Sequence, residues 1–415
     1  MKVIAFDSWT AGYFHFSRLL QSFGDYGFNL KLIHLGSWGH DKNRPRFEII
    51  DGLPVYDISF YGKKSFLEIL TYEKPDAIIF LCTEAFAHRA FNRYAKILGI
   101  PTLNLYHGLL AVQAVESGKP DKFNFFAQTK LILVRLFKNI FIIWPIYLRA
   151  LILTKASFSE YIKFCDHIFC KIFGKYIRVL GIDSQTSACA VYTAADIDHA
   201  KIKFHLDNSQ IKVVGNPDLL KFNFQEKHFG CCLQEKIKSK KILYIDHGGS
   251  TCGLNFNSPA DFLNFLITLR SKLLTFNYEL IIKLHPSQLK AGFDDNVKSS
   301  GLYVCDDSNF LSAMQYCDAV ITGPSSASIL PALMGLPILL LRFGPFTGQK
   351  YGKILNTYPR TIILDEVMEI DNLICEEANS VNFSKVWEWI RINSGPMPID
   401  QMPSRVAEII HGLVS

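Results

Sequence analysis

Short apolar runs alternate with longer stretches of helical periodicity along most of the chain. This alternation is typical of parallel α/β layers, in which each strand is followed by a helix. The runs are rich in Leu, Ile and Val and nearly continuous, as expected for strands that are buried on both faces of a sheet. In the first half the predicted strands are Lys2–Phe6, Leu30–Leu35, Val55–Ile58, Ala77–Leu81, Thr102–Tyr106, Ala190–Tyr192 and Lys212–Val214.

The second half begins a new series of strands after a Gly-Asn-Pro sequence and a polar, lysine-rich stretch. These strands are Lys241–Ile245, Glu279–Leu284, Leu302–Cys305, Ala319–Thr322, Ile338–Leu341 and Thr361–Leu364. The pattern predicts two doubly wound domains, an N-terminal one of residues 1–217 and a C-terminal one of residues 218–415. Ligands bind beyond the carboxyl ends of such strands, so we expect the site in a central cleft that the two domains face.

The composition fits two globular domains. A length of 415 residues allows each half its own core, and 49% apolar with 20% charged residues excludes a disordered chain. The net charge of +6 is too small to indicate nucleic acid, but it suits an anionic substrate or membrane surface. The ten cysteines form no CxxC pair, and no long apolar signal segment follows the N-terminus. We therefore expect a cytoplasmic protein with free thiols.

One segment, 123–164, interrupts the alternation. It is rich in Leu, Ile and Phe, and its longest uncharged stretch, Asn139–Leu148, has ten residues, too few to span a bilayer. Arg135, Lys138 and Arg149 fall on one face at helical spacing. Two interpretations remain open. The segment is either a basic amphipathic insertion at the cytoplasmic face of the inner membrane or a pair of ordinary core helices.

The most informative motif, Lys283-Leu284-His285-Pro286, ends a predicted apolar strand. Because proline cannot continue the strand, His285 is delivered at its carboxyl end, where a ligand would bind. An imidazole there donates to a phosphate oxygen or assists a leaving group, and Lys283 adds positive charge. We predict that Lys283, His285 and Pro286 belong to a phosphate site.

Two glycine-containing turns of the second half are further candidates for this site. Gly323, Ser325 and Ser326 lie between a strand and a helix, where backbone N–H groups and hydroxyls form anion sites; simple helix capping is the alternative. The second turn follows Asp246 and His247 after another strand, and its glycines allow a ligand to approach closely, as they also allow an ordinary tight turn. Its residues are Gly248, Gly249 and Ser250.

The first half offers candidates on the acceptor side. His107 follows a strand and precedes a glycine, so it is a candidate general base, with a core histidine as the alternative. Glu116 offers a carboxylate for the same role. The loop after the first strand contains Trp9 and Tyr13, whose rings are able to stack on a sugar, and Gly12, which allows close approach.

Together these motifs resemble a clan of GT-B transferases that includes bacterial sialyl- and polysialyltransferases, Kdo transferases and CDP-glycerol glycerophosphotransferases. The shared order is His-Gly in the first domain, then Lys-x-His-Pro, then a serine pair before a helix. The resemblance implies the GT-B fold, a phosphate-binding role for His285, Ser325 and Ser326, and a base role for His107. Asp246 only partly matches the acidic motif of sialyltransferases, so a nucleophilic or electrostatic role fits it better.

The resemblance implies a glycosyltransferase of capsule or lipopolysaccharide synthesis. It transfers a Kdo- or sialic-acid-type sugar from a CMP-activated donor to a glycan or lipid-linked acceptor. The stretch Ile329–Met334 lacks the ribose-binding glutamate of many UDP- or GDP-sugar enzymes, which favours a cytidine donor. No Asp-x-Asp metal motif stands out at the end of a predicted strand, so we expect neither metal nor cofactor. The alternatives are a UDP-sugar transferase, a UDP-sugar 2-epimerase, a CDP-glycerol-type glycerophosphotransferase, or a membrane-surface assembly protein with a degenerate GT-B fold.

Overall fold

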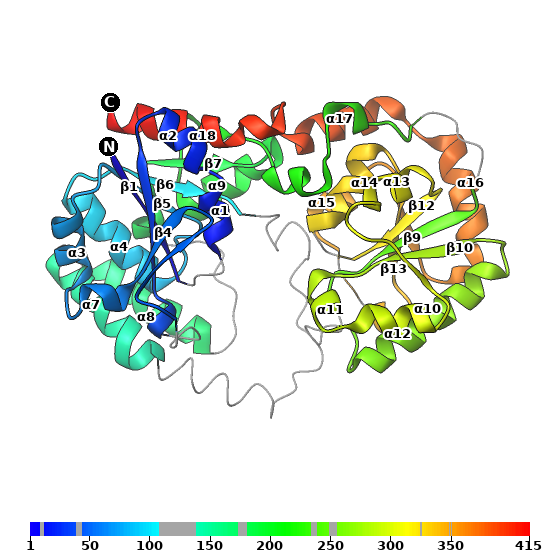
Figure 1. The fold of residues 1–415 in the computed structure, drawn as a ribbon, viewed down its shortest axis with the longest axis horizontal. Coiled ribbons are helices and arrows are strands. Elements are labelled where there is room, and N and C mark those ends of the chain that lie inside the picture. The colour runs from blue at the N-terminus through cyan, green and yellow to red at the C-terminus, as the bar shows by residue number, and fades with distance from the viewer. Residues whose placement is uncertain are drawn as a thin grey trace. The chain divides into compact units, whose positions relative to one another are not determined.

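The computed structural model contains two compact units, and each is described by itself (Figure 1). The described residues are 1–8, 12–38, 44–107, 138–172, 181–233, 239–248, 255–323, 326–347, 349 and 351–415. Those within 1–107, 138–215 and 395–415 form the first unit, and those within 216–394 form the second.

The first unit is built on an eight-stranded sheet of order β3-β4-β2-β1-β5-β6-β7-β8, parallel except for β3. Its strands are β1 (Lys2–Asp7), β2 (Asn29–His34), β3 (Phe47–Ile50), β4 (Leu53–Asp57), β5 (Ala77–Phe80), β6 (Thr102–Leu105), β7 (Ala188–Val191) and β8 (Ile211–Val213). Its helices include α1 (Tyr13–Ser17), α2 (Leu20–Asp25), α3 (Phe66–Glu73), α4 (Phe86–Ile97), α7 (Trp144–Leu153), α8 (Phe158–Ile172), α9 (Ile197–Phe204) and α18 (Met402–Val414). All the strands predicted for this half are present.

The strand β3 was not predicted from the apolar pattern. It is an antiparallel edge strand whose positions are exposed or half-buried, so it carries no continuous apolar run. Asp51 and Gly52 join it to β4 with φ angles of 49° and 78°. Two consecutive positive φ angles are typical of a type I′ hairpin turn, for which Asp-Gly is a favoured sequence. This dipeptide was the local signal for the hairpin.

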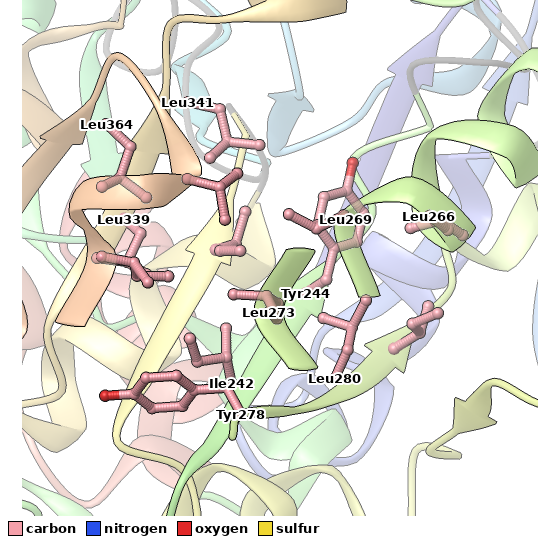
Figure 2. Close-up of a cluster of buried hydrophobic side chains, with 14 of the residues drawn as sticks. Ile242, Tyr244, Leu266, Leu269, Leu273, Tyr278, Leu280, Leu339, Leu341 and Leu364 are labelled. Atoms are coloured by element: carbon pink, nitrogen blue, oxygen red, sulfur yellow. The ribbon is translucent and has the colours of Figure 1, made fainter. Parts of the chain in front are cut away.

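The second unit is built on a six-stranded parallel sheet of order β11-β10-β9-β12-β13-β14, and all its predicted strands are present. The strands are β9 (Lys241–Ile245), β10 (Glu279–Lys283), β11 (Tyr303–Val304), β12 (Ala319–Thr322), β13 (Ile338–Leu341) and β14 (Thr361–Leu364). Its helices include α10 (Pro259–Leu274), α11 (Pro286–Lys290), α12 (Phe293–Ser299), α13 (Phe310–Gln315), α14 (Ile329–Met334), α15 (Lys353–Asn356), α16 (Ile370–Ser380) and α17 (Phe383–Ser394). Figure 2 shows its core, where Leu269 and Leu273 of α10 cover Ile242 and Tyr244 of β9.

The C-terminal helix α18 packs on the first unit beside α2 (Figure 1). Its apolar stripe, which includes Val406 and Ile410, is fully buried there. Arg405 Nη1 donates to the carbonyl oxygen of Val214 at 3.0 Å. The predicted C-terminal domain of 218–415 is therefore corrected at both ends, because the second unit begins at Asn216 and ends at residue 394.

The described part of the basic segment, 138–164, forms a π-helical turn, Asn139–Ile143, followed by α7 and the first half of α8. The inner faces of these helices are joined to α4 through Arg89, which donates to Tyr147 Oη at 2.8 Å and to Asp183 Oδ2 at 2.9 Å. Arg89 Nη1 also lies 2.7 Å from His167 Nδ1 on α8. Burial favours the neutral acid, but the Arg89 guanidinium holds the pKa of Asp183 below its usual value. The network fixes which face of α7 and α8 points inward.

We expect Asp183→Ala to destabilise the first unit by about 3–5 kcal/mol, because it leaves the buried Arg89 guanidinium without its carboxylate. Urea denaturation followed by circular dichroism measures the change. The matched control is Asp198→Ala, which removes an exposed partner of Lys201 on α9 and should change stability little. Equal losses in the two variants would contradict a structural role for the buried pair.

Candidate functional site

Three of the predicted motifs meet at one edge of the second sheet. The loops after β9, β10 and β12 are neighbours there, because β9 is paired with both other strands in parallel. Numbered from β9, the strand order is 3-2-1-4-5-6, so the order reverses between β9 and β12. Open α/β sheets bind ligands at this switch point, beyond the carboxyl ends of the strands. Asp246, His285 and Gly323 all lie at this edge.

Asp246 holds two of the loops in place. Its side chain is buried, with 3% of the residue exposed. Oδ1 accepts a hydrogen bond from Gly248 N at 2.9 Å, and Oδ2 accepts one from His285 N at 3.2 Å. Both carboxylate oxygens thus serve backbone N–H groups, which is the geometry of a positioning residue. The nucleophilic or electrostatic role expected for Asp246 stays a prediction.

His285 is the N-cap of α11, and its ring is held in one orientation. Nδ1 accepts from Ser287 N at 3.3 Å and lies 2.7 Å from Ser287 Oγ. Since a backbone N–H only donates, Nδ1 of the neutral ring carries no proton and the Nε2–H group is left to donate to a ligand. Burial lowers the pKa of His285. The charge of Asp246 raises this pKa, whereas His247 and Lys283 lower it further. The ring is therefore neutral at pH 7.

Gly323 lies directly against the ring of His247. A β-carbon at position 323 would lie 2.4 Å from His247 Nδ1, so a larger residue would displace the ring. On the other side of the ring, Nε2 lies 2.9 Å from Asn255 Oδ1. The contact fixes the loop after β12 against the loop after β9.

The remaining predicted phosphate ligands are only partly described. Gly249, Ser250 and Ser325 lie outside the described residues, as does the side chain of Ser326. Pro286 is the first residue of α11, as a helix start allows. Lys283 is buried, and its Nζ lies 2.6 Å from Asp307 Oδ1, so its charge is already compensated. A contact between Lys283 and phosphate would require this ion pair to open.

The first sheet has a second switch point, between β1 and β5, because its central order is β4-β2-β1-β5-β6. Asp7 ends β1 and is buried, and its Oδ2 has no hydrogen-bond partner among the described residues. His88 of α4 is buried beside it, with Nε2 at 3.7 Å from Asp7 Oδ1. This buried Asp–His pair was not predicted, because a histidine inside a helix gives no local signal. Only the pairing of β1 with β5 brings the two residues together.

His107 follows β6 at the same edge of the sheet and is exposed. Its Nδ1 lies 3.0 Å from the carbonyl oxygen of Leu81, which only accepts, so Nδ1 carries the proton. The Nε2 lone pair is thereby left to accept a proton, as a general base requires. The ring of His15 from α1 meets the His107 ring edge-on, with centroids 5.6 Å apart.

The other acceptor-side candidates are spread around this edge. Gly12 is the N-cap of α1 and Tyr13 its first residue. Trp9 and Glu116 lie outside the described residues. Another carboxylate that follows β5, Glu84, forms an ion pair with Lys203 of α9. His107, Gly12 and Tyr13 belong to the first unit, and the acceptor-side role of each stays a prediction. The structure adds Asp7 and His88 to these candidates.

Comparisons with known proteins show the fold. No protein-family model matches the chain, and no curated protein matches it. Among solved structures, the calicheamicin glycosyltransferase CalG4 is similar over 99% of this chain and 98% of its own, with a TM-score of 0.51 and 11% identity. The UDP-GlcNAc 2-epimerase of Methanocaldococcus jannaschii, solved with UDP-GlcNAc and UDP, is similar over 99% of this chain and 100% of its own, with a TM-score of 0.45 and 11% identity. The wall teichoic acid polymerase TagF is similar over 100% of this chain and 88% of its own, with a TM-score of 0.46 and 11% identity. The likeness to CalG4, together with the two doubly wound sheets, confirms the predicted fold class: the chain has the GT-B fold.

Proposed function

We propose that the protein is a metal-independent glycosyltransferase with a CMP-activated donor. The donor sugar is a Kdo- or sialic-acid-type ulosonic acid, and the acceptor is a glycan or lipid-linked glycan of a surface polysaccharide. The nucleotide phosphate binds at the carboxyl edge of the second sheet. The acceptor hydroxyl is activated by residues of the first unit.

The observation that carries this proposal is the Nε2–H group of His285 at the switch point of the second sheet. Negative charge grows on the nucleotide phosphate as its bond to the sugar breaks. A donor that is already oriented stabilises this charge without reorganisation, which is the usual source of large rate effects. His285 is oriented twice over, since Asp246 accepts from its backbone N–H group and Ser287 donates to Nδ1. The site is thus suited to a leaving phosphate.

The cytidine base is inferred from α14. All residues of this helix are buried, and none is acidic, so the helix offers no carboxylate for ribose hydroxyls. Many GT-B enzymes that use UDP- or GDP-sugars carry a glutamate on the corresponding helix. The apolar α14 therefore favours a cytidine donor, as in the clan that the motifs resemble.

The base that takes the acceptor proton is His107 in this proposal. Its free lone pair at Nε2 follows from the hydrogen bond between Nδ1 and Leu81 O. The nearby Asp7–His88 pair supplies a second polar group for the acceptor, because Asp7 Oδ2 and His88 Nε2 have no hydrogen-bond partner among the described residues. Buried polar atoms of this kind are uncommon and often face a ligand.

We expect a thermal-shift panel of CMP, CDP, UDP, GDP and UDP-GlcNAc to show stabilisation by CMP or CDP alone. A nucleotide at about 100 times its Kd stabilises the folded state by about 2.7 kcal/mol, which is readily measured. A shift with UDP or UDP-GlcNAc would instead indicate a UDP-sugar transferase or 2-epimerase. The absence of any shift would contradict the proposal and favour a non-enzymatic protein.

The variant Gly323→Ala tests where the nucleotide binds. The added β-carbon displaces the His247 ring, so we expect nucleotide affinity to fall by about tenfold or more, or ~1.4 kcal/mol. Gly412→Ala is the matched control, because an added β-carbon there meets no heavy atom within 4 Å on α18 of the first unit. If both variants keep the affinity of the natural protein, the nucleotide does not bind at this loop.

A further inference from the structure

The outer faces of α7 and α8 are apolar. On the π-helical turn and α7, Phe141, Pro145, Leu148 and Ile152 follow one another at helical spacing, and all four are exposed. On α8 the same spacing is found at Phe158, Ile162, Cys165 and Phe169, which are also exposed. Phe141 is 69% and Phe158 is 79% exposed. A helix of a water-facing surface normally carries polar residues on its outer face, so these apolar outer stripes depart from the usual pattern.

This orientation is fixed by the buried sides of the two helices. Tyr147 of α7 and His167 of α8 both contact Arg89 of α4 inside the first unit. Arg93 of α4 reaches the other end of α7, where Nη2 donates to Thr154 Oγ1 at 2.7 Å. Turning either helix to bury its outer stripe would break these bonds and leave buried charges unpaired. The two apolar stripes are therefore a permanent feature of this surface.

Positive charge borders the stripes. Arg149 on α7, Lys155 between the helices and Lys163 on α8 are exposed. Of the acidic residues on α8, Glu160 is paired with Arg93, which leaves Asp166 exposed. Beside α7, a cavity of about 260 Å³ is lined by Lys63, Lys64 and Arg149, and by no acidic residue. Glu68 of α3 interacts electrostatically with Arg149 and Lys64, but its pKa is lowered chiefly by its hydrogen bonds to Ser65.

We propose that α7 and α8 form a docking surface for a membrane that contains anionic phospholipid. The apolar stripes enter the boundary between headgroups and acyl chains, and the bordering cations contact lipid phosphates. The cavity beside α7 has the size and charge to take one phosphate headgroup. Within the described residues, no helix has both the length and the apolar character to cross a bilayer.

A lipid surface fits these observations better than a second copy of the chain. In a twofold symmetric dimer the same patch meets itself, so Arg149, Lys155 and Lys163 would approach the same cations of the partner. Like charges across an interface oppose association, whereas an anionic lipid surface attracts all of them. A membrane contact would also bring the enzyme to a lipid-linked acceptor.

Flotation of the full chain with unilamellar vesicles tests the proposal. We expect binding to phosphatidylcholine vesicles that contain about 30% phosphatidylglycerol, and little binding to phosphatidylcholine alone. The fourfold variant Phe141→Ser, Ile152→Ser, Phe158→Ser and Ile162→Ser should lose at least about tenfold in affinity for the vesicles. The double variant Arg149→Gln and Lys163→Gln should lose roughly fivefold for each cation, and only with anionic vesicles.

The control is a fourfold variant on similarly exposed apolar residues elsewhere, with serine at Ile49, Ile202, Tyr316 and Met368. It should bind as the natural protein does, and circular dichroism should show all variants to be folded. Equal binding to neutral and anionic vesicles would overturn the proposal, as would equal losses in the two fourfold variants. Light scattering measures the oligomeric state and tests the alternative occupant. If the natural chain does not bind vesicles but forms a dimer, and the fourfold variant on α7 and α8 is a monomer, a second copy of the chain covers this face and the proposal is wrong.

Discussion

Replacing His285 with alanine is expected to lower kcat for donor cleavage by about 10²–10³, or ~2.7–4 kcal/mol, the loss that follows removal of one oriented donor from a developing anion. The Nε2–H group of His285 is such a donor, because Ser287 N occupies Nδ1. Release of CMP from a CMP-activated sugar measures the change and requires no acceptor. The folded state should be retained, since Asp246 bonds the backbone of residue 285 and not its ring.

The variant His285→Gln separates this role from simple packing. Glutamine places an N–H donor near the position of Nε2, so it should recover part of the rate that alanine loses. Ser287→Ala is a second comparison, because it removes the hydroxyl beside Nδ1 but keeps the backbone N–H group that holds the ring. Full activity in His285→Ala would show that His285 does not stabilise the leaving phosphate.

The predicted strands were recognisable because a strand buried on both faces needs apolar side chains at every position. β9, β12, β13 and β14 have the bounds that the apolar runs predict. The hairpin strand β3 has no such run, since its positions are exposed or half-buried, and its Asp51-Gly52 turn was the signal that remained. Local patterns thus predict strands that carry an apolar run, including the edge strand β14, better than a strand without one.

The loops of the candidate site could also be predicted, but the function of each side chain in them could not. Asp246 and Lys283 are charged residues at strand ends, which suggested chemistry at both. The structure shows that Asp246 accepts hydrogen bonds from two backbone N–H groups and that Lys283 forms an ion pair with Asp307. Gly248 is local to Asp246, but His285 and Asp307 follow other strands, so no pattern around Asp246 or Lys283 reveals these two partners.

The same reason explains why Asp7 and His88 were not predicted together. They are separated along the chain by a sheet crossover, and their contact depends on β1 lying next to β5. Both sheets place buried polar side chains at the point where the strand order reverses, Asp246 in one and Asp7 in the other. The difference is that both Asp246 oxygens accept described hydrogen bonds, whereas Asp7 Oδ2 has no described partner. Asp7 is therefore a better alternative to His107 than Asp246 is for contact with the acceptor.

The variant His107→Asn is expected to reduce acceptor-dependent CMP release by about 10²–10⁴-fold, the usual contribution of a general base. Asparagine keeps an N–H group near Nδ1, so the contact with Leu81 O is retained while the Nε2 lone pair is lost. Acceptor-independent hydrolysis of the donor should fall much less, because it depends on the phosphate site around His285. A loss of both activities would place His107 in donor binding instead.

Asp7→Asn is the comparison that decides between the two candidate bases. The substitution keeps the size of the side chain and removes its charge, and His88 stays beside it. If His107 is the base, Asp7→Asn should affect the affinity for acceptor more than the rate at saturation. A rate loss at Asp7 with an unchanged rate at His107 would transfer the role to the Asp7–His88 pair. Because the proposed nucleotide site lies on the second unit, both variants are expected to retain the CMP-induced thermal shift. A variant that still unfolds cooperatively but has lost this shift has lost donor binding, whereas a variant without a cooperative transition has lost its fold.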